Sequence, residues 1–154
     1  MPKLGYSYNK KVNEEKTVRA TGKDFRISFK DSMEICREIN GKRLAYAKRF
    51  LTEVIEKKRA VPYRTHKKGL AHRRGLTKAY AGAYPLKAAS HMLKLLENAE
   101  ANAGFKGLDT EMLFIKHIQA KKARPIRGFL PRAMGRATPH DTTTTHIEVW
   151  LDER

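Results

Sequence analysis

The side chains of this sequence that are best suited to chemistry are cations, and the chemistry that they offer is the binding of phosphate. Between Lys121 and His146 the chain carries six lysine and arginine residues before it reaches an acid, Asp141. Lysine and arginine neutralise phosphates and release counterions, and the planar guanidinium can also stack on a base. The few apolar residues of the segment follow no sustained period, which predicts a long basic arm that folds against a partner. Its cations are Lys121, Lys122, Arg124, Arg127, Arg132 and Arg136.

A second basic segment, residues 60–84, falls in a window without acidic residues between Glu56 and Glu97. It mixes Pro, Gly and Tyr with cations and shows no durable period, so we expect an irregular insertion. Tyr63, Tyr80 and Tyr84 could stack on the bases of single-stranded or irregular RNA, or could equally pack on the core. The RNA-binding candidates in and beside this segment are Arg59, Arg64, His66, Lys67, Lys68, His72, Arg73 and Arg74.

The net charge of +17 indicates a polyanionic partner, either nucleic acid or an anionic membrane. No apolar stretch approaches the ~18 residues of a spanning helix, and the N-terminus lacks a signal-peptide core, so we expect a soluble, intracellular protein without a membrane partner. A lone Cys36 offers neither a disulfide nor a multi-cysteine zinc site. We expect a single domain over residues 1–154, with an N-terminal tail at 1–17, the insertion at 60–84 and the arm at 119–146.

Catalytic chemistry finds little support in the sequence. The acid pairs Asp31–Glu34 and Glu97–Glu100 have the three-residue spacing of helix caps and solvated faces, and no glycine-rich nucleotide motif is present. The histidines are scattered without a recognisable ligand motif, and we interpret His66 and His72 as facing RNA. We therefore predict no catalytic residue, no metal and no cofactor. The histidines are His66, His72, His91, His117, His140 and His146.

The elements that must position these cations are short. Alternating apolar residues predict three strands, and residues that recur three or four apart predict three helices. Ser28 and Asp31 offer a helix cap, Gly41 a stop, and Pro85 a first helical residue. The predicted strands are residues 24–28, 111–118 and 145–151, and the predicted helices are residues 29–41, 43–58 and 85–104.

Two of these strands bracket the arm, so they should pair antiparallel as the base of an extended hairpin, with Phe25 and Ile27 on a third strand. The predicted fold is α+β: three helices packed on a small antiparallel sheet of about three strands, with a long protruding basic β-hairpin. Cys36 and Trp150 should lie in the core or at its edge. Met134, in the arm, has nothing available to bury it.

Three short stretches resemble a known family when they are taken together. NAEANA at residues 98–103, PRAMGRA at 131–137 and HIEV at 146–149 have the order and spacing of the twenty-second protein of the large ribosomal subunit, whose eukaryotic member is counted as seventeen. The resemblance covers nearly the whole chain. The insertion VPYRTHKKGLAHRRG and the stretch NAEANAGFKGLD are similar to the archaeal form of the family.

The resemblance implies a structural, non-catalytic constituent of the cytoplasmic ribosome that binds and bridges domains of large-subunit ribosomal RNA. Its hairpin would line the tunnel through which nascent polypeptide leaves, close to the fourth large-subunit protein, and it would not form homo-oligomers. Lys121, Lys122, Arg124 and Arg127 would then follow the outgoing limb and Arg136 the return limb. The tunnel-facing tip would hold Pro131, Arg132, Ala133, Met134 and Gly135.

The return limb departs from the family pattern. Bacterial relatives often keep basic residues there, whereas this chain has Pro139, His140, Asp141 and four threonines. Two other classes of protein share part of the pattern. An architectural DNA-binding protein would use the same charge and ribbon and would bind duplex DNA as tightly as structured RNA. An RNA-processing enzyme would need a defined acid, base or metal constellation and would lose activity when one histidine is changed.

Overall fold

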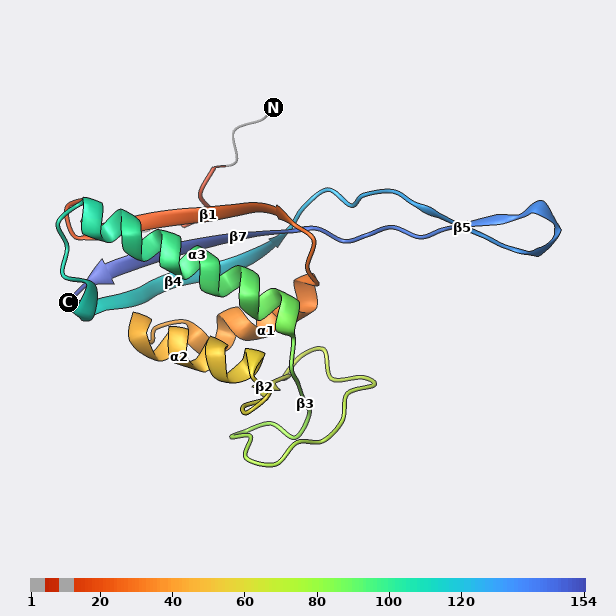
Figure 1. The fold of residues 1–154 in the computed structure, drawn as a ribbon, viewed down its shortest axis with the longest axis horizontal. Coiled ribbons are helices and arrows are strands. Elements are labelled where there is room, and N and C mark those ends of the chain that lie inside the picture. Colours follow the sequence, from red (N-terminus) through yellow and green to blue (C-terminus); the bar gives the residue numbers. More distant parts are fainter. Residues whose placement is uncertain (1–4, 9–12) are drawn as a thin grey trace.

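A three-stranded antiparallel sheet, covered by helices on one face, forms the body of the protein (Figure 1). The structure is a computed structural model that describes residues 5–8 and 13–154. The strand order is β1 (Thr17–Phe25), β7 (Thr145–Glu153) and β4 (Leu113–Lys122). Helix α3 packs on β1 and β7, α1 packs on β4, and α2 packs on α3. The helices are α1 (Phe29–Ile39), α2 (Leu44–Ile55) and α3 (Leu86–Phe105), and the predicted α+β class is confirmed.

The register of the sheet follows from its alternating apolar residues. Val149 of β7 lies opposite Ala20 of β1 on one side and Ile118 of β4 on the other, and all three side chains are buried beneath the helices. A β-bulge between Ile115 and His117 shifts the pairing of β4 with β7. On the other face of β7, Trp150 is only 9% exposed because Tyr6, Tyr8 and Arg19 lie against its ring. This places Trp150 at the edge of the core, as predicted.

The helices form where the apolar spacing predicted them. Ser28 caps α1 by accepting a hydrogen bond from the Asp31 amide at 3.4 Å, and Gly41 follows the helix with a φ of +74°. Cys36 is buried in the core, as expected. Pro85 stands at the N-cap of α3 rather than at its first helical residue, a difference of one position. Helices α1 and α3 turn an apolar stripe toward the sheet, and α2 turns one mainly toward α3.

The first strand lies earlier in the chain than residues 24–28, so that prediction was wrong. Strand β1 runs from Thr17 to Phe25, and its inward residues Val18, Ala20 and Gly22 are small, which hid the alternation. Ile27 is buried but lies in the link to α1, where its carbonyl accepts a hydrogen bond from the hydroxyl of Thr145 at 3.0 Å. Of the predicted tail, residues 1–4 and 9–12 lie outside the described residues.

The insertion is less irregular than expected. Strands β2 (Val61–Pro62) and β3 (Gly82–Ala83) pair antiparallel and close its two ends. Strands of two residues are too short to produce a period in the sequence, which explains why they were missed. Val61 and Tyr63 belong to the hydrophobic core, so the insertion is attached to the body by buried residues.

Beyond the sheet, β4 and β7 continue into a two-stranded arm that projects from the body (Figure 1). Ile126 and Thr142 exchange both backbone hydrogen bonds, at 2.9 and 2.8 Å. Farther out, β5 (Phe129–Pro131) pairs with β6 (Ala137–Pro139). A short turn over Ala133–Gly135 closes the tip, where Met134 has a φ of +59° and is 92% exposed. The predicted strands thus extend further than expected, because β4 begins at Leu113 but continues to Lys122.

Candidate nucleic-acid interface

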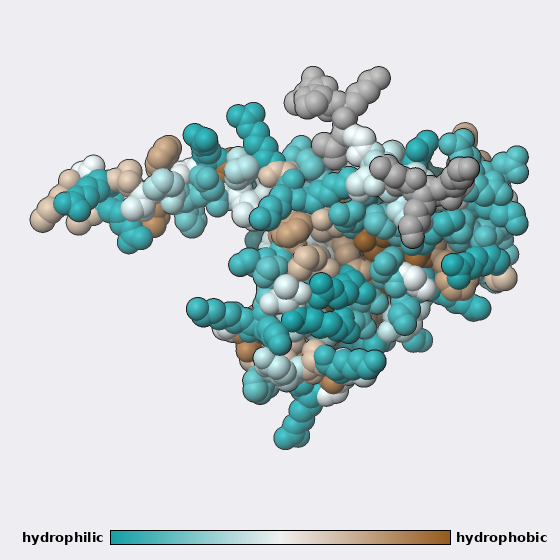
Figure 2. Space-filling model, turned by 180° about the vertical axis from the view of Figure 1, so that it is seen from behind, coloured by the Kyte–Doolittle hydropathy of each residue, from teal (hydrophilic) through white to brown (hydrophobic). Residues whose placement is uncertain are grey.

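The arm presents arginines to solvent along both limbs. Arg124, Arg127, Arg132 and Arg136 are all exposed, and no acidic side chain among residues 5–8 and 13–154 forms an ion pair with any of them. Figure 2 shows the arm as mostly hydrophilic, with hydrophobic side chains in between. The exposed hydrophobic residues there are Ile126, Phe129, Leu130 and Met134. An exposed cation without a protein partner keeps its full charge for an external anion.

The two lysines at the root of the arm are placed differently. Lys121 lies in β4, and its Nζ contacts the Glu148 carboxylate at 2.7 Å. The Nζ of Lys122 lies 5.5 Å from the centre of the Phe29 ring. Burial acts to raise the pKa of Glu148, but hydrogen bonds from Lys121 and Ser7 outweigh it, and the pKa falls below its ordinary value. Glu148 therefore neutralises part of the charge of Lys121, and this pairing was not predicted from the sequence.

At the start of the insertion, two of the candidate arginines also have internal partners. Arg59 Nη2 donates to the hydroxyl of Tyr46 at 2.9 Å, and its guanidinium lies 4.9 Å from the centre of the Phe50 ring. Arg64 pairs with Glu38 at 3.1 Å. These contacts fix the direction of each guanidinium, and both side chains remain partly exposed.

The remaining insertion candidates have no ion pair with any described acidic residue. Several lie against tyrosines: Lys67 is 5.1 Å from the centre of the Tyr80 ring, and Arg73 is 5.2 Å from that of Tyr84. His72 meets Tyr80 edge to face. This is the interleaving of aromatic rings and cations that the sequence predicted. The candidates in this group are His66, Lys67, Lys68, His72, Arg73 and Arg74.

The three tyrosines of the insertion differ in how deeply they are buried. Tyr63 packs in the core, 3% exposed, and its hydroxyl donates to Asp31 at 2.7 Å. Burial raises the pKa of Tyr63, and the hydrogen bond to Asp31 raises it further. Tyr84 is half-buried, whereas Tyr80 is 54% exposed. Only Tyr80 keeps most of its ring free to stack on a base.

Glu34, which its sequence spacing assigned to a helix cap or a solvated face, is instead a buried acid that holds the start of the insertion. Glu34 of α1 is fully buried and accepts hydrogen bonds from the backbone amides of Thr65 at 2.9 Å and Arg64 at 3.3 Å. Burial alone would raise the pKa of Glu34, but these amide bonds and the charge of Arg37 lower it below its ordinary value. The sequence signal for this role was the position of Glu34 on the buried side of an amphipathic helix. A buried carboxylate needs hydrogen-bond donors from another part of the chain.

The two basic segments meet at the end of the body from which the arm projects. One hollow there is lined by Tyr84 and Pro85, at the end of the insertion, and by Thr142 and Thr143, on the return limb of the arm. Within the described residues, no three His, Cys, Asp or Glu side chains gather as metal ligands. In the same residues, no helix is both long and apolar enough to cross a membrane.

These features define a class of protein: a small α+β body whose sheet extends into an arginine-bearing ribbon beside a basic loop. Residues 20–152 match the profile of the family described as ribosomal protein L22p/L17e, and the chain belongs to that family. Three relatives are each named large ribosomal subunit protein uL22. The relative from Archaeoglobus fulgidus is 50% identical over 154 residues, which cover 100% of this chain and 99% of the relative.

The other two relatives show a similar extent of likeness. The protein from Methanopyrus kandleri is 55% identical over 93% of this chain and 91% of its own length. The protein from Methanocaldococcus jannaschii is 49% identical over 99% of this chain and 97% of its own length. The resemblance to the archaeal form that the insertion suggested is therefore confirmed.

Proposed function

We propose that this chain is a structural constituent of the large ribosomal subunit in the cytoplasm and binds large-subunit ribosomal RNA. The observation that carries the proposal is the ribbon of exposed arginines without acidic partners among the described residues. A narrow two-stranded arm can enter between RNA helices where a globular face cannot, and its arginines then neutralise phosphates on both sides. The family and the named relatives support the same assignment.

The finer part of the proposal concerns where each segment goes. The insertion and the root of the arm bind different domains of the ribosomal RNA and so bridge them. The tip from Pro131 to Gly135 lines the nascent-peptide exit tunnel, next to the fourth large-subunit protein. The 92% exposure of Met134 supports this, because an apolar side chain at the end of a ribbon is suited to a wall that nascent polypeptide passes.

Co-sedimentation tests the main assignment. The tagged chain, expressed in an archaeal host with its own ribosomes, should sediment with large subunits in moderate salt. A variant with Arg127→Gln, Arg132→Gln and Arg136→Gln should shift toward the free fraction, while Lys94→Gln, which removes an exposed cation on α3, should not. Recovery of the unaltered chain only as free protein would contradict the assignment. Binding to duplex DNA as tight as to structured RNA would favour the architectural alternative.

A single cysteine can test the position of the tip. Cys36 is buried, so a Met134→Cys chain carries one accessible thiol. In assembled ribosomes with an arrested nascent chain, that thiol should cross-link to a thiol-reactive group within the nascent chain. Thr143→Cys, at the root of the arm, is the matched control and should not react with the nascent chain. Equal cross-linking at both positions would contradict the proposed position of the tip at the tunnel wall.

A further inference from the structure

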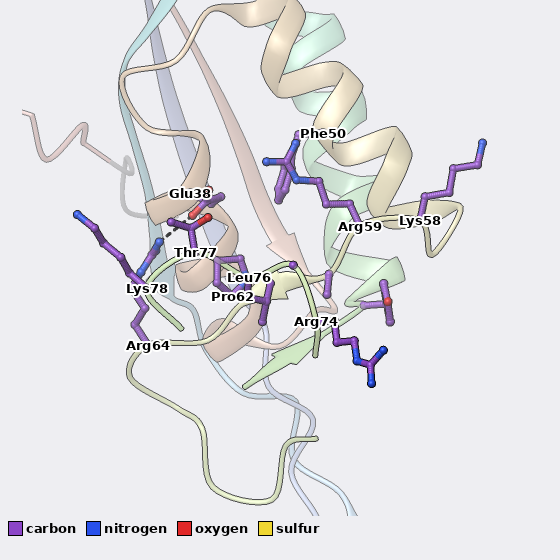
Figure 3. A pocket seen from close by; sticks show the side chains of 13 residues that line it. Glu38, Phe50, Lys58, Arg59, Pro62, Arg64, Arg74, Leu76, Thr77 and Lys78 are labelled. Atoms are coloured by element: carbon purple, nitrogen blue, oxygen red, sulfur yellow. Dashed lines mark hydrogen bonds and ion pairs between the residues drawn. The ribbon is translucent and has the colours of Figure 1, made fainter. Parts of the chain in front are cut away.

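A hollow under the insertion, separate from the arm, has the chemistry of a nucleotide site. It has a volume of about 420 Å³, within the usual range for small-molecule sites. Figure 3 shows it between the end of α2 and the loop of residues 74–78. Its lining combines apolar side chains with five cations and a single carboxylate. The residues used below are Phe50, Arg59, Pro62, Arg74, Leu76 and Lys78.

The apolar side of this hollow is firmly packed. Phe50 is 1% exposed, and Pro62 is buried in β2. Leu76 fits against Gly82 so closely that a Cβ at position 82 would lie 2.7 Å from its Cδ1 atom. Because these groups are held by the β2–β3 pair and by α2, the floor exists before any ligand arrives. Leu76 is the member of this floor that keeps accessible surface, and an apolar surface suits a flat, uncharged ring system better than a lone anion.

One planar cation is fixed beside that floor. The guanidinium of Arg59 lies 4.9 Å from the centre of the Phe50 ring and is held by the Tyr46 hydroxyl and by Glu53, at 2.9 and 3.5 Å. Its side chain is nevertheless 42% exposed. Bases that leave a stack in RNA commonly settle on guanidinium planes or aromatic rings. Arg59 therefore offers a base a surface that is already oriented.

The rim supplies charge for phosphate. Arg74 and Lys78 extend outward from the two ends of the 74–78 loop (Figure 3). Neither forms an ion pair with a described acidic residue, and the carboxylate in the lining, Glu38, is already paired with Arg64 at 3.1 Å. A base in the hollow would leave its 5′ and 3′ phosphates at the mouth, where these two cations lie. Acidic protein segments lack the ring that the floor would accept.

We propose that this hollow takes one unstacked nucleotide of single-stranded RNA, with the base on the floor beside Arg59 and the flanking phosphates on Arg74 and Lys78. The proposal rests on the proposed function, because it names how the insertion engages RNA. It deepens that function by adding a contact with a base to contacts with phosphate. The remaining cations of the insertion then guide the strand on either side of the hollow.

The test compares two probes of equal charge by amide chemical shifts of the full chain. Hexa-adenylate and an abasic hexamer with the same sugar-phosphate backbone differ only in their bases. We expect hexa-adenylate to bind about ten-fold more tightly, as stacking of a single base would give. It should also shift the amides of Ala60, Gly75 and Leu76 more than those of the arm. Equal affinity for the two probes, or shifts confined to the arm, would overturn the proposal.

Two variants sharpen the result. Thr77 is exposed and lines the hollow, so Thr77→Leu should reduce its free volume without disturbing the core and without adding a ring on which a base could stack. That variant should lose most of the preference for hexa-adenylate, with abasic affinity within about two-fold of the unaltered chain. Arg59→Lys keeps the charge but loses the plane, and should reduce the preference for hexa-adenylate. Lys94→Gln, outside the hollow, should leave the preference intact. A preference that survives Thr77→Leu undiminished would also refute the site.

The proposed function and this inference can fail separately. If the unaltered chain co-sediments with large subunits but does not prefer hexa-adenylate, the nucleotide site is wrong and the ribosomal assignment stands. If the chain prefers hexa-adenylate through these residues but never co-sediments with large subunits, the nucleotide site is supported and the ribosomal assignment is wrong.

Discussion

The buried carboxylate of Glu34 accepts a hydrogen bond from the backbone amide of Thr65 at 2.9 Å. This bond joins the first helix to the start of the basic insertion, thirty-one positions later in the sequence. The same carboxylate accepts a second bond from the amide of Arg64, so one side chain satisfies two backbone donors of a segment that has little regular structure.

Replacing Glu34 by alanine should therefore destabilise the protein and loosen the insertion. The two amides would lose their acceptor beneath the surface, at a cost of about 2–3 kcal/mol in the free energy of unfolding. Urea denaturation measures this loss, and faster hydrogen exchange at the Thr65 amide locates it. Glu97→Ala, on the exposed side of α3, is the control and should change stability by less than about 0.5 kcal/mol. An unchanged exchange rate at Thr65 would contradict the prediction.

Stability should also fall in acid, because folding lowers the pKa of both Glu34 and Glu148. A lowered folded-state pKa means that the native state favours the ionised carboxylate. The resulting stability is present above the ordinary value of 4.5 and is lost as the pH falls through the folded-state pKa. The free energy of unfolding, measured by urea at pH values between about 6 and 3, should decline in that window. Glu34→Gln should flatten the decline, and an identical slope in this variant would be inconsistent with it.

Gly128→Ala should disturb the arm without disturbing the body. A Cβ there would lie 2.7 Å from the carbonyl oxygen of His140, so the two limbs would have to separate and the bond from the His140 amide to the Gly128 carbonyl would weaken. We expect faster amide exchange at His140 and weaker RNA binding, with the urea midpoint unchanged. Gly104→Ala is a matched control, since its Cβ would meet nothing within 4 Å. A lowered midpoint for Gly128→Ala would show that the arm and the body unfold together.

RNA binding should depend steeply on salt, and the dependence should fall with each arginine removed that has no acidic partner among the described residues. Each neutralised phosphate contributes about 0.7–0.9 to the slope of log K against log salt, so Arg127→Gln, Arg132→Gln and Arg136→Gln together should reduce it by about 2 to 3. Filter binding to large-subunit RNA at several salt concentrations measures the slope. Lys121→Gln is the informative comparison, because Glu148 already neutralises part of that charge. An equal loss of slope per residue for Lys121 would contradict the structural distinction between the two groups.

The thiol of Cys36 should be unreactive in the native protein. Burial raises its pKa to about 12, so almost no thiolate forms near neutral pH. A thiol-reactive dye at pH 8 should label the native chain only at the rate of its unfolding, and should label it fully in urea. Rapid labelling without denaturant would mean that α1 opens locally.

Much of the fold follows from the spacing of apolar residues. The three helices, the two strands that flank the arm and the burial of Cys36 were all predictable, since amphipathic periods of adequate length leave few alternatives. Strand β1 was misplaced because Ala20 and Gly22 are small, and their burial depends on α3 packing over them rather than on their own hydrophobicity. Local sequence cannot show that a small residue is covered.

The cations of the candidate interface could be predicted from the sequence. Which of them pair with acidic side chains and which stay exposed could not. Charge counts placed Lys121 and Arg124 in one group, whereas the structure pairs the first with Glu148 and leaves the second exposed. Glu148 comes twenty-seven positions after Lys121, and only the register of β4 against β7 brings them together. The fixed guanidinium of Arg59 depends likewise on Tyr46 and Phe50, which lie in the preceding helix α2.

The central position of β7 has a consequence for the order in which the protein forms. Strand β7 fills the gap between β1 and β4, yet a ribosome synthesises it only after both limbs of the arm. Until then β1 and β4 have no partner between them, and the apolar faces of α1 and α3 have only part of their support. During synthesis the basic arm therefore emerges before the body can close, and an RNA strand that captures the arm would meet a protein that is still folding.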